Sequence, residues 1–203
     1  MFSIMDDDGN VLMVEEPSQE YVYTYADYLK WKFEERLELF KGKIFKMAAP
    51  NTKHQEVSGN LFFMIRSHLA DNPCKVFSAP FDVRLPVQNR KKDTEITTVV
   101  QPDLCVVCDM SKLDEKGCCG APDTIAEILS PGNSRKEVQQ KFSLYEETGV
   151  PEYWIINPVE ENLIIYTLRN GKYIGSKPYA PDEIITSSVL QGIRIEVSAI
   201  FKK

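Results

Sequence analysis

The stretch that decides the fold is residues 123–130, which read DTIAEILS and carry Glu127 inside an apolar run. A second apolar run, PDLCVVC at residues 102–108, opens with Asp103 directly after a proline. Short apolar runs bounded by turn residues are typical of buried strands. The two runs therefore predict neighbouring strands with one carboxylate each, and burying Glu127 is costly unless it is paired or bound to a metal.

The segment that follows, residues 135–148, has the apolar periodicity of an amphipathic helix, and Gly149 is a suitable C-terminal cap. At ~100° per residue, Lys141 falls at the edge of the apolar stripe of this helix. The helix begins directly after the strand of Glu127, so a tight turn at residues 131–134 is expected to bring Lys141 near that acid.

The rest of the chain alternates between predicted helices and strands, without repeats or an interior domain boundary. The expected elements are a short helix capped by Thr24, a hairpin over 37–47, an amphipathic helix over 53–69, strands over 74–85 and 97–108, a hairpin over 153–168, and short strands over 173–177 and 193–197. The charged or glycine-rich composition of residues 88–95 and 109–122 predicts surface loops.

This order of elements predicts the fold class and the domain organisation. The class is α/β or mixed α+β, with a central mixed β-sheet flanked by helices. Residues 1–20 are expected to form a polar, acidic N-terminal arm, and residues 21–203 a single domain.

Composition and charge indicate a soluble, globular protein. Of the 203 residues, 43% are hydrophobic and 27% charged, which suits one domain with a sizeable core. No apolar run approaches the ~20 residues needed to cross a bilayer, and the acidic N-terminus lacks the order of a signal peptide, so we expect a cytoplasmic protein with no membrane partner. The formal net charge of −6 argues against a non-specific coat on nucleic acid, but not against a nuclease whose acidic site is neutralised by its metal.

The five cysteines favour the same compartment. Their number is odd and no disulfide framework is expected, so Cys105 and Cys108 should pack as small hydrophobes. A zinc site is also disfavoured. The spacing of Cys105 and Cys108 sends their side chains to opposite faces of a strand, and Cys118 and Cys119 are adjacent rather than spaced as a second C-x-x-C pair.

Asp103, Glu127 and Lys141 are the parts needed to hold a divalent metal against a phosphodiester. Both carboxylates are hard oxygen ligands for Mg²⁺ or Mn²⁺, and the backbone carbonyl of Ile128 can complete the protein's share of the shell. The metal lowers the pKa of a bound water, while Lys141 orients that water and stabilises transition-state charge. Asp123 is a weaker candidate because it lies roughly 13 Å from Glu127 along an extended strand, so we interpret it as a turn residue.

Several motifs together resemble the Uma-two family, whose members are named as restriction endonucleases. The motifs are PD at 102–103, PDTIAEILSP at 122–131, KFSLY at 141–145 and GVPEYWIINP at 149–158, with ELFKGKI at 38–44 and His54 upstream. The resemblance covers about residues 22–201.

This resemblance implies membership of the PD-(D/E)XK nuclease superfamily, a restriction-endonuclease-like core, Mg²⁺ dependence and DNA cleavage. Asp103 and Glu127 match the two acidic positions. Leu129 stands where the usual motif has its lysine, and Lys141 on the following helix resembles a migrated counterpart. DNA is the implied partner, and a homodimer is a further expectation, since nucleases that cut both strands often act as symmetric dimers.

The weaker positions also have plain structural interpretations. Lys141 can lean along the edge of its helix or pair with Glu137 at i, i+4. Glu38 and His54 could reach the same cleft as outer-shell groups. Taken alone, however, Glu38 is more typical of an exposed strand residue, and His54 of a surface or capping residue in the first turn of a helix.

The sequence therefore predicts a metal-dependent endonuclease that hydrolyses phosphodiester bonds in DNA. The alternative is a catalytically silent nuclease-like fold that acts as a binding or interaction module, which the acidic net charge and Leu129 favour. A zinc-stabilised structural protein is a third and weaker alternative.

Overall fold

The computed structural model describes residues 2–5, 11–14, 21–31, 36–47, 49–86, 91–130 and 135–202. None of the helices in these ranges is both long enough and apolar enough to cross a membrane. The elements are, in chain order, β1 (Phe2–Met5), β2 (Val11–Val14), α1 (Tyr25–Tyr28), β3 (Leu37–Phe40), β4 (Lys43–Lys46), α2 (Thr52–His68), β5 (Lys75–Ser78), β6 (Val83–Arg84), β7 (Val99–Val100), β8 (Leu104–Val107), η1 (Met110–Lys112), β9 (Leu113–Asp114), β10 (Gly117–Cys119), β11 (Thr124–Ile128), α3 (Arg135–Thr148), β12 (Glu152–Asn157), β13 (Asn162–Arg169), β14 (Lys172–Gly175), β15 (Ile184–Thr186), β16 (Arg194–Glu196) and α4 (Val197–Ile200).

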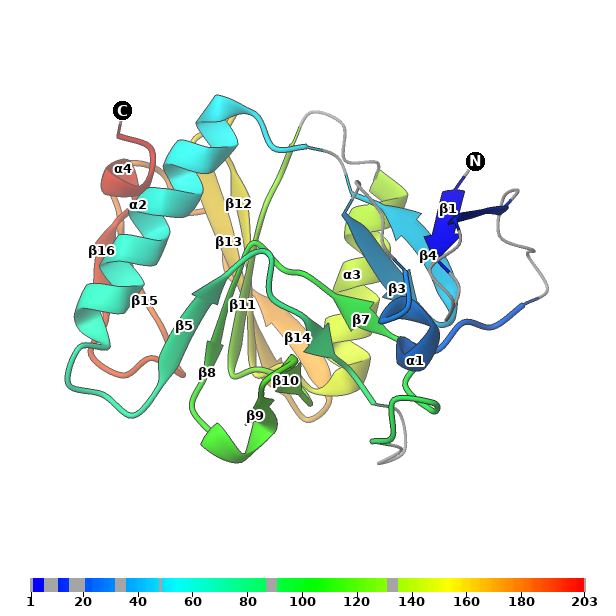
Figure 1. The fold of residues 1–203 in the computed structure, drawn as a ribbon. Coiled ribbons are helices and arrows are strands. Elements are labelled where there is room, and N and C mark those ends of the chain that lie inside the picture. Colours follow the sequence, from blue (N-terminus) through cyan, green and yellow to red (C-terminus); the bar gives the residue numbers. More distant parts are fainter. Residues whose placement is uncertain are drawn as a thin grey trace.

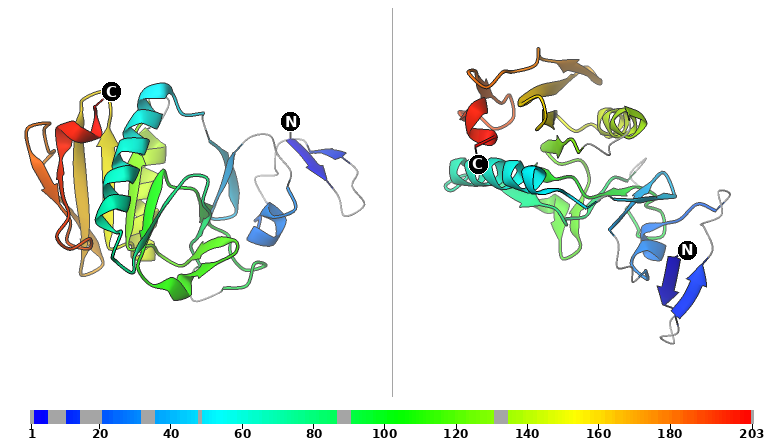
Figure 2. Two further views of the ribbon diagram at one scale, coloured as in Figure 1. Left: turned by 60° about the vertical axis from the view of Figure 1, so that its left-hand side comes forward. Right: turned by 90° about the horizontal axis from the view of Figure 1, so that it is seen from above.

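The main sheet has six strands in the order β14-β13-β12-β11-β8-β5. Strands β11 and β12 are parallel, and the other neighbours are antiparallel. One face packs with α2 and α4 around Trp154, and the other packs with α3 around Tyr153, since adjacent strand residues point to opposite faces. Figure 1 labels these layers, and the right-hand view of Figure 2 shows α2 and α3 on the two sides of the sheet. The predicted mixed sheet flanked by helices is confirmed.

A second six-stranded sheet, in the order β4-β3-β7-β6-β10-β9, arises because two predicted strands each split. Residues 74–85 divide into β5 and β6 around Pro80, and residues 97–108 divide into β7 and β8 around Pro102. A proline has no N–H to donate to a ladder and is excluded from the interior of a sheet. The expectation of two continuous strands is therefore wrong. Each segment gives one strand to each sheet, and Asp103 lies where the chain crosses between them.

Residues 109–122 are more ordered than the surface loop predicted for them. They contain η1, β9 and β10, and β10 runs parallel to β6 in the second sheet. Gly117 has a φ of +120° and lies so close to the backbone carbonyl of Asp82 that a side chain would clash, while Cys118 is fully buried. The surface-loop prediction is wrong for β10, where a glycine permits close approach of two strands, whereas most of residues 109–116 are exposed.

Most of the other predicted elements are confirmed. A capping box of Thr24 and Asp27 opens α1, and Asn51 caps α2. The hairpins β3–β4 and β12–β13 form as predicted, and Gly149 follows α3 in a left-handed conformation. Strand β15, which pairs with β16, is an addition. Within the arm, β1 and β2 form an antiparallel hairpin, and the turn predicted at residues 131–134 lies outside the described residues.

One expectation about the cysteines is wrong, because Cys108 is not a free thiol. It forms a disulfide with Cys74. The pairing of Lys75 with Val107 between β5 and β8 places the two cysteines opposite each other at the end of the ladder. Cys105 is free and buried, as expected for a small hydrophobe.

Candidate active site

Two acids from adjacent strands meet at one end of the main sheet. Glu127 lies on β11, and Asp103 directly precedes β8, which pairs with β11 through Leu104 and Ala126. Asp103 Oδ2 accepts a hydrogen bond of 2.7 Å from the backbone N–H of Ile128. The side chains of Asp103 and Glu127 are only 16% and 12% exposed. The structure thus brings the two predicted acids to one buried place.

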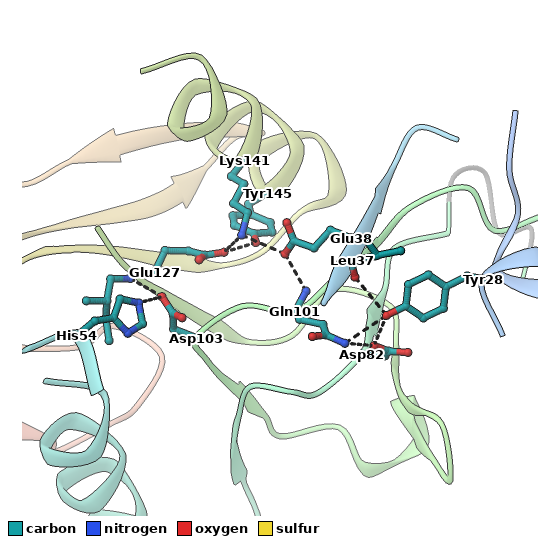
Figure 3. Close-up of polar contacts among 11 residues, drawn as sticks. Tyr28, Leu37, Glu38, His54, Asp82, Gln101, Asp103, Glu127, Lys141 and Tyr145 are labelled. Carbon is teal, nitrogen blue, oxygen red and sulfur yellow. Dashed lines mark hydrogen bonds and ion pairs between the residues drawn. The ribbon is translucent and has the colours of Figure 1, made fainter. Parts of the chain in front are cut away.

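The predicted lysine reaches this place from α3. Lys141 Nζ lies 2.9 Å from Glu127 Oε1 and 3.1 Å from Glu38 Oε1. Tyr145, one helical turn further on, donates a hydrogen bond of 2.6 Å to the same oxygen of Glu127. Figure 3 shows the ammonium between the two glutamates. Lys141 therefore lies beside Glu127, as the helical phase predicts, and its role as a migrated motif lysine stays a prediction.

Glu38 belongs to this cluster and is not the exposed strand residue that the sequence favours. It lies on β3 and is 8% exposed. Its Oε1 also accepts a hydrogen bond of 2.9 Å from the backbone N–H of Gln101. The side-chain amide of Gln101 in turn donates to Asp82 at 2.9 Å and to the hydroxyl of Tyr28 at 3.2 Å. The pairing of β3 with β7 carries Glu38 inward, which a local pattern does not reveal.

His54 is likewise buried rather than on the surface. It lies in the first turn of α2, where its backbone N–H donates to the capping residue Asn51 at 2.9 Å, and it is 7% exposed. Its Nε2 lies 3.2 Å from Asp103 Oδ2, whereas Nδ1 has no hydrogen-bond partner among the described residues. Burial lowers the pKa of His54, but the hydrogen bond and charge of Asp103 outweigh burial and leave that pKa raised. The predicted surface position is therefore wrong.

Two carboxylates share one ammonium in this cluster, and the third, Asp103, lies against His54. Burial is the largest cause that raises the pKa of Glu127 to about 7; Lys141 opposes it, and Asp103 and Glu38 add to it. Burial alone would lower the pKa of Lys141, but the two glutamates raise it above its ordinary range. Burial also raises the pKa of Tyr145. Lys141 is therefore a fixed cation, Tyr145 a fixed hydroxyl donor, and the cluster carries an excess of negative charge.

The cluster forms the floor of a cavity of about 170 Å³. One wall is the hairpin β3–β4, the other wall is α3, and the end of β11 lies between them. The lining residues are Glu38, Phe40, Phe45, Lys46, Met47, His54, Asp103, Glu127, Ile128, Leu129, Ser130, Glu137, Val138, Gln140, Lys141 and Tyr153. The cavity connects otherwise buried acids with solvent.

The donor set fits a divalent cation that prefers oxygen ligands. Asp103, Glu127 and the carbonyl of Ile128 supply hard oxygens, and the excess negative charge favours a cation. Over the described ranges, no three His, Cys, Asp or Glu side chains converge as a ready-made metal cage. Mg²⁺ does not need one, because it keeps several waters and is usually bound by one or two carboxylates together with phosphate oxygens.

The rival acid Asp123 lies at the opposite end of β11 from Glu127. Its Oδ2 accepts a hydrogen bond of 2.7 Å from the backbone N–H of Cys108. This contact ties the end of β8 to the start of β11, which agrees with its interpretation as a turn residue.

Two members of the cluster are not singled out by the sequence. Tyr145 falls in the apolar stripe of its helix, and its only signal is the i, i+4 spacing from Lys141. Gln101 has no local signal, because its partner Glu38 is 63 residues away in the chain.

The mixed sheet and its helices thus bring together one acid on β11, one acid directly before the neighbouring β8, and a lysine on the following helix. A solved structure titled as a putative nuclease belonging to DUF820 from Anabaena variabilis matches this fold with a TM-score of 0.70 and 21% identity, over 88% of this chain and 97% of that chain. A family model described as Uma2, putative restriction endonuclease, matches residues 25–198, so the chain belongs to the Uma2 family. The uncharacterized protein slr1290 of Synechocystis sp. is 23% identical over 180 residues, which are 87% of this chain and 90% of that protein.

Proposed function

We propose that this protein is an endonuclease that hydrolyses phosphodiester bonds in DNA with the help of Mg²⁺ or Mn²⁺. The proposal depends chiefly on one observation. The ammonium of Lys141 lies within 3.1 Å of both Glu127 and Glu38, beside Asp103, on the floor of a cavity in a nuclease-like fold. Membership of the Uma2 family supports it.

Asp103, Glu127 and the carbonyl of Ile128 would hold the cation. When bound, the metal supplies a water of lowered pKa and offsets negative charge on the reacting phosphate. The hydrogen bond from Ile128 N–H to Asp103 Oδ2 and the hydroxyl of Tyr145 on Glu127 orient the two acids before any ligand arrives. Preorganisation of this kind avoids a reorganisation cost during the reaction.

Lys141 acts as a fixed positive charge rather than as a base. Its pKa is raised because, against the opposing effect of burial, Glu127 and Glu38 stabilise the ammonium, so it does not lose a proton near neutral pH. An ammonium in this position stabilises the negative charge that develops on the phosphate oxygens and orients the attacking water. Glu38 keeps the ammonium in place through its own contact at 3.1 Å.

The test is a plasmid-nicking assay with purified protein and Mg²⁺ or Mn²⁺. We expect the wild type to convert supercoiled plasmid to the nicked form and Glu127→Ala and Glu127→Gln to abolish the conversion. Asp123→Asn is the matched control, since it changes an acid directly before the same strand and outside the cluster. Equal cleavage by Glu127→Gln and wild type would show that the assignment is wrong.

A second candidate is a nuclease-like module that binds a partner without catalysis. The contact of Lys141 with Glu127 favours it, because an ammonium 2.9 Å from Oε1 already compensates part of the acid's charge. Calorimetric titration with Mn²⁺ separates the two candidates. Binding that Glu127→Gln abolishes supports the endonuclease, and the absence of binding at millimolar Mn²⁺ supports the silent module.

A further inference from the structure

Both faces of the hairpin β3–β4 carry apolar side chains. Leu39 and Ile44 are cross-strand partners that pack in the core beneath the hairpin. A hairpin with one buried face normally presents polar side chains on the other. Here the other face carries Glu38 directly opposite Phe45, and Met47 follows two residues later on that same face. Phe45 and Met47 both line the cavity above the acids.

The acids at the base of the cavity are only slightly exposed. The carboxylates of Glu38, Asp103 and Glu127 are between 10% and 16% exposed, so a phosphate can reach them only by entering the cavity. Its volume of about 170 Å³ is below the roughly 300–1,000 Å³ of pockets that enclose drug-sized ligands. A space of this size can enclose one small group of a substrate, such as a single base, but not the width of a base-paired duplex.

The apolar wall residues Phe45 and Met47 fit the base of a nucleotide rather than its phosphate, while Lys46 between them also lines the cavity. Phosphate groups are bound mainly by Lys, Arg and backbone N–H groups, and neither a phenyl ring nor a thioether supplies one. The flat face of a base stacks on aromatic side chains irrespective of its sequence. A thioether is polarizable and also packs well against rings. Phe45 and Met47 thus provide an apolar surface within the same cavity as the acids.

We propose that the enzyme acts on DNA whose nucleotide next to the scissile phosphate is unpaired, and that this base lies against Phe45 and Met47. Single strands, flaps and frayed ends have this property, and an intact duplex acquires it only by unstacking a nucleotide at a cost of a few kcal/mol. The inference rests on the proposed function for the cleavage step, whereas the preference for an unpaired nucleotide can be measured by binding alone.

Binding is measured by fluorescence anisotropy with a short fluorescein-labelled DNA strand of mixed sequence, alone and annealed to its complement, in Ca²⁺. We expect tighter binding of the single strand. Phe45→Ala should weaken that binding by roughly 5- to 100-fold, the range for loss of one base–aromatic stack, and Phe45→Tyr should retain it. Phe63→Ala is the matched control, because Phe63 lies on α2, is 70% exposed and does not line the cavity.

The outcomes separate this inference from the proposed function. Equal binding and cleavage of duplex and single strand, both insensitive to Phe45→Ala, would overturn the inference while leaving the endonuclease intact. Binding of the single strand that depends on Phe45, without cleavage in Mg²⁺ or Mn²⁺, would support the inference and remove the endonuclease. If Phe45→Ala does not fold by circular dichroism, Phe45→Leu replaces it, since leucine keeps the apolar bulk but has no ring, and unchanged binding by that variant overturns the inference.

Discussion

Two buried glutamates on neighbouring strands of the main sheet have opposite surroundings. Glu152, at the start of β12, is fully buried and accepts four hydrogen bonds, all from uncharged donors. The donors are Trp154 Nε1, Ser187 Oγ, and the backbone N–H and hydroxyl of Ser188. Glu127, on β11, contacts one ammonium and one hydroxyl and has two further carboxylates nearby.

The difference separates a structural acid from an acid available for chemistry. A buried carboxylate with four donors is satisfied, and it joins β12 to the segment before β16. Glu127 is incompletely compensated, so its pKa is raised to about 7, first by burial. A buried carboxylate whose charge is incompletely compensated is found mainly at functional sites, where a bound ligand can supply the missing positive charge. The variants below test whether the two acids differ in this way.

The largest expected effect is on catalysis, from Lys141→Met. Removing the ammonium takes away charge stabilisation that is worth about 10²–10³ in rate for a single lost donor in comparable sites. Lys172→Met is the control, because Lys172 pairs with Glu146 on the surface and its side chain is 80% exposed. Nicking rates measured per folded molecule check the prediction, and a rate within about two-fold of wild type would contradict the role given to Lys141.

Glu152→Gln is expected to lower stability without lowering cleavage by the folded fraction. An amide cannot accept from all four donors, and leaving charged-acceptor hydrogen bonds unmade costs on the order of 3 kcal/mol. Urea denaturation measures the change, with Glu196→Gln as an exposed control on β16. If Glu152→Gln is as stable as wild type but inactive, Glu152 is needed for cleavage and not for stability, and its interpretation as a structural acid is wrong.

The pH dependence of stability should reveal the poor compensation of Glu127. Its folded-state pKa of about 7 lies above the ordinary 4.5, so the folded protein binds the extra proton between these values. Stability from this group is fully present below pH ~4.5 and is lost as the pH rises through ~7, by on the order of 3 kcal/mol. We expect the stability of wild type relative to Glu127→Gln, measured in EDTA, to fall across this window. Saturating Mg²⁺ should flatten the curve, and a flat curve in EDTA would show that Glu127 is compensated after all.

Whether the sequence can predict that two site residues meet depends on how far apart they lie along the chain. Asp103, Glu127 and Lys141 converge as expected, because they lie on consecutive segments, and Lys141 and Glu127 are only 14 residues apart. Helical phase and strand spacing are local properties, so they carry over from sequence to structure. The splitting of two predicted strands at prolines is also visible in the sequence once Pro80 is weighed as a strand breaker.

The buried positions of Glu38 and His54 could not be predicted from local patterns. The contact of Glu38 with Lys141 spans 103 residues, and it exists only because a second sheet pairs β3 with β7. His54 has the local environment of any residue in the first turn of a helix, and no local pattern indicates its contact with Asp103. Contacts between residues far apart in the sequence, and not local secondary-structure propensity, determine that both side chains are buried.

The smallest expected effect belongs to Tyr145→Phe, which removes one donor from Glu127. The hydroxyl at 2.6 Å lowers the pKa of Glu127 by stabilising its ionised form, against the larger effect of burial. Without the hydroxyl the pKa should rise further, so a smaller fraction of Glu127 is ionised at neutral pH. We expect nicking at pH 7 to fall by roughly ten-fold or less, the equivalent of about 1 kcal/mol for one hydrogen bond, and to recover at higher pH. Calorimetric Mn²⁺ binding should weaken in parallel at pH 7 and recover likewise. A loss that is the same at every pH would instead mean that Tyr145 supports only the packing of α3, because a packing defect does not depend on the protonation of Glu127.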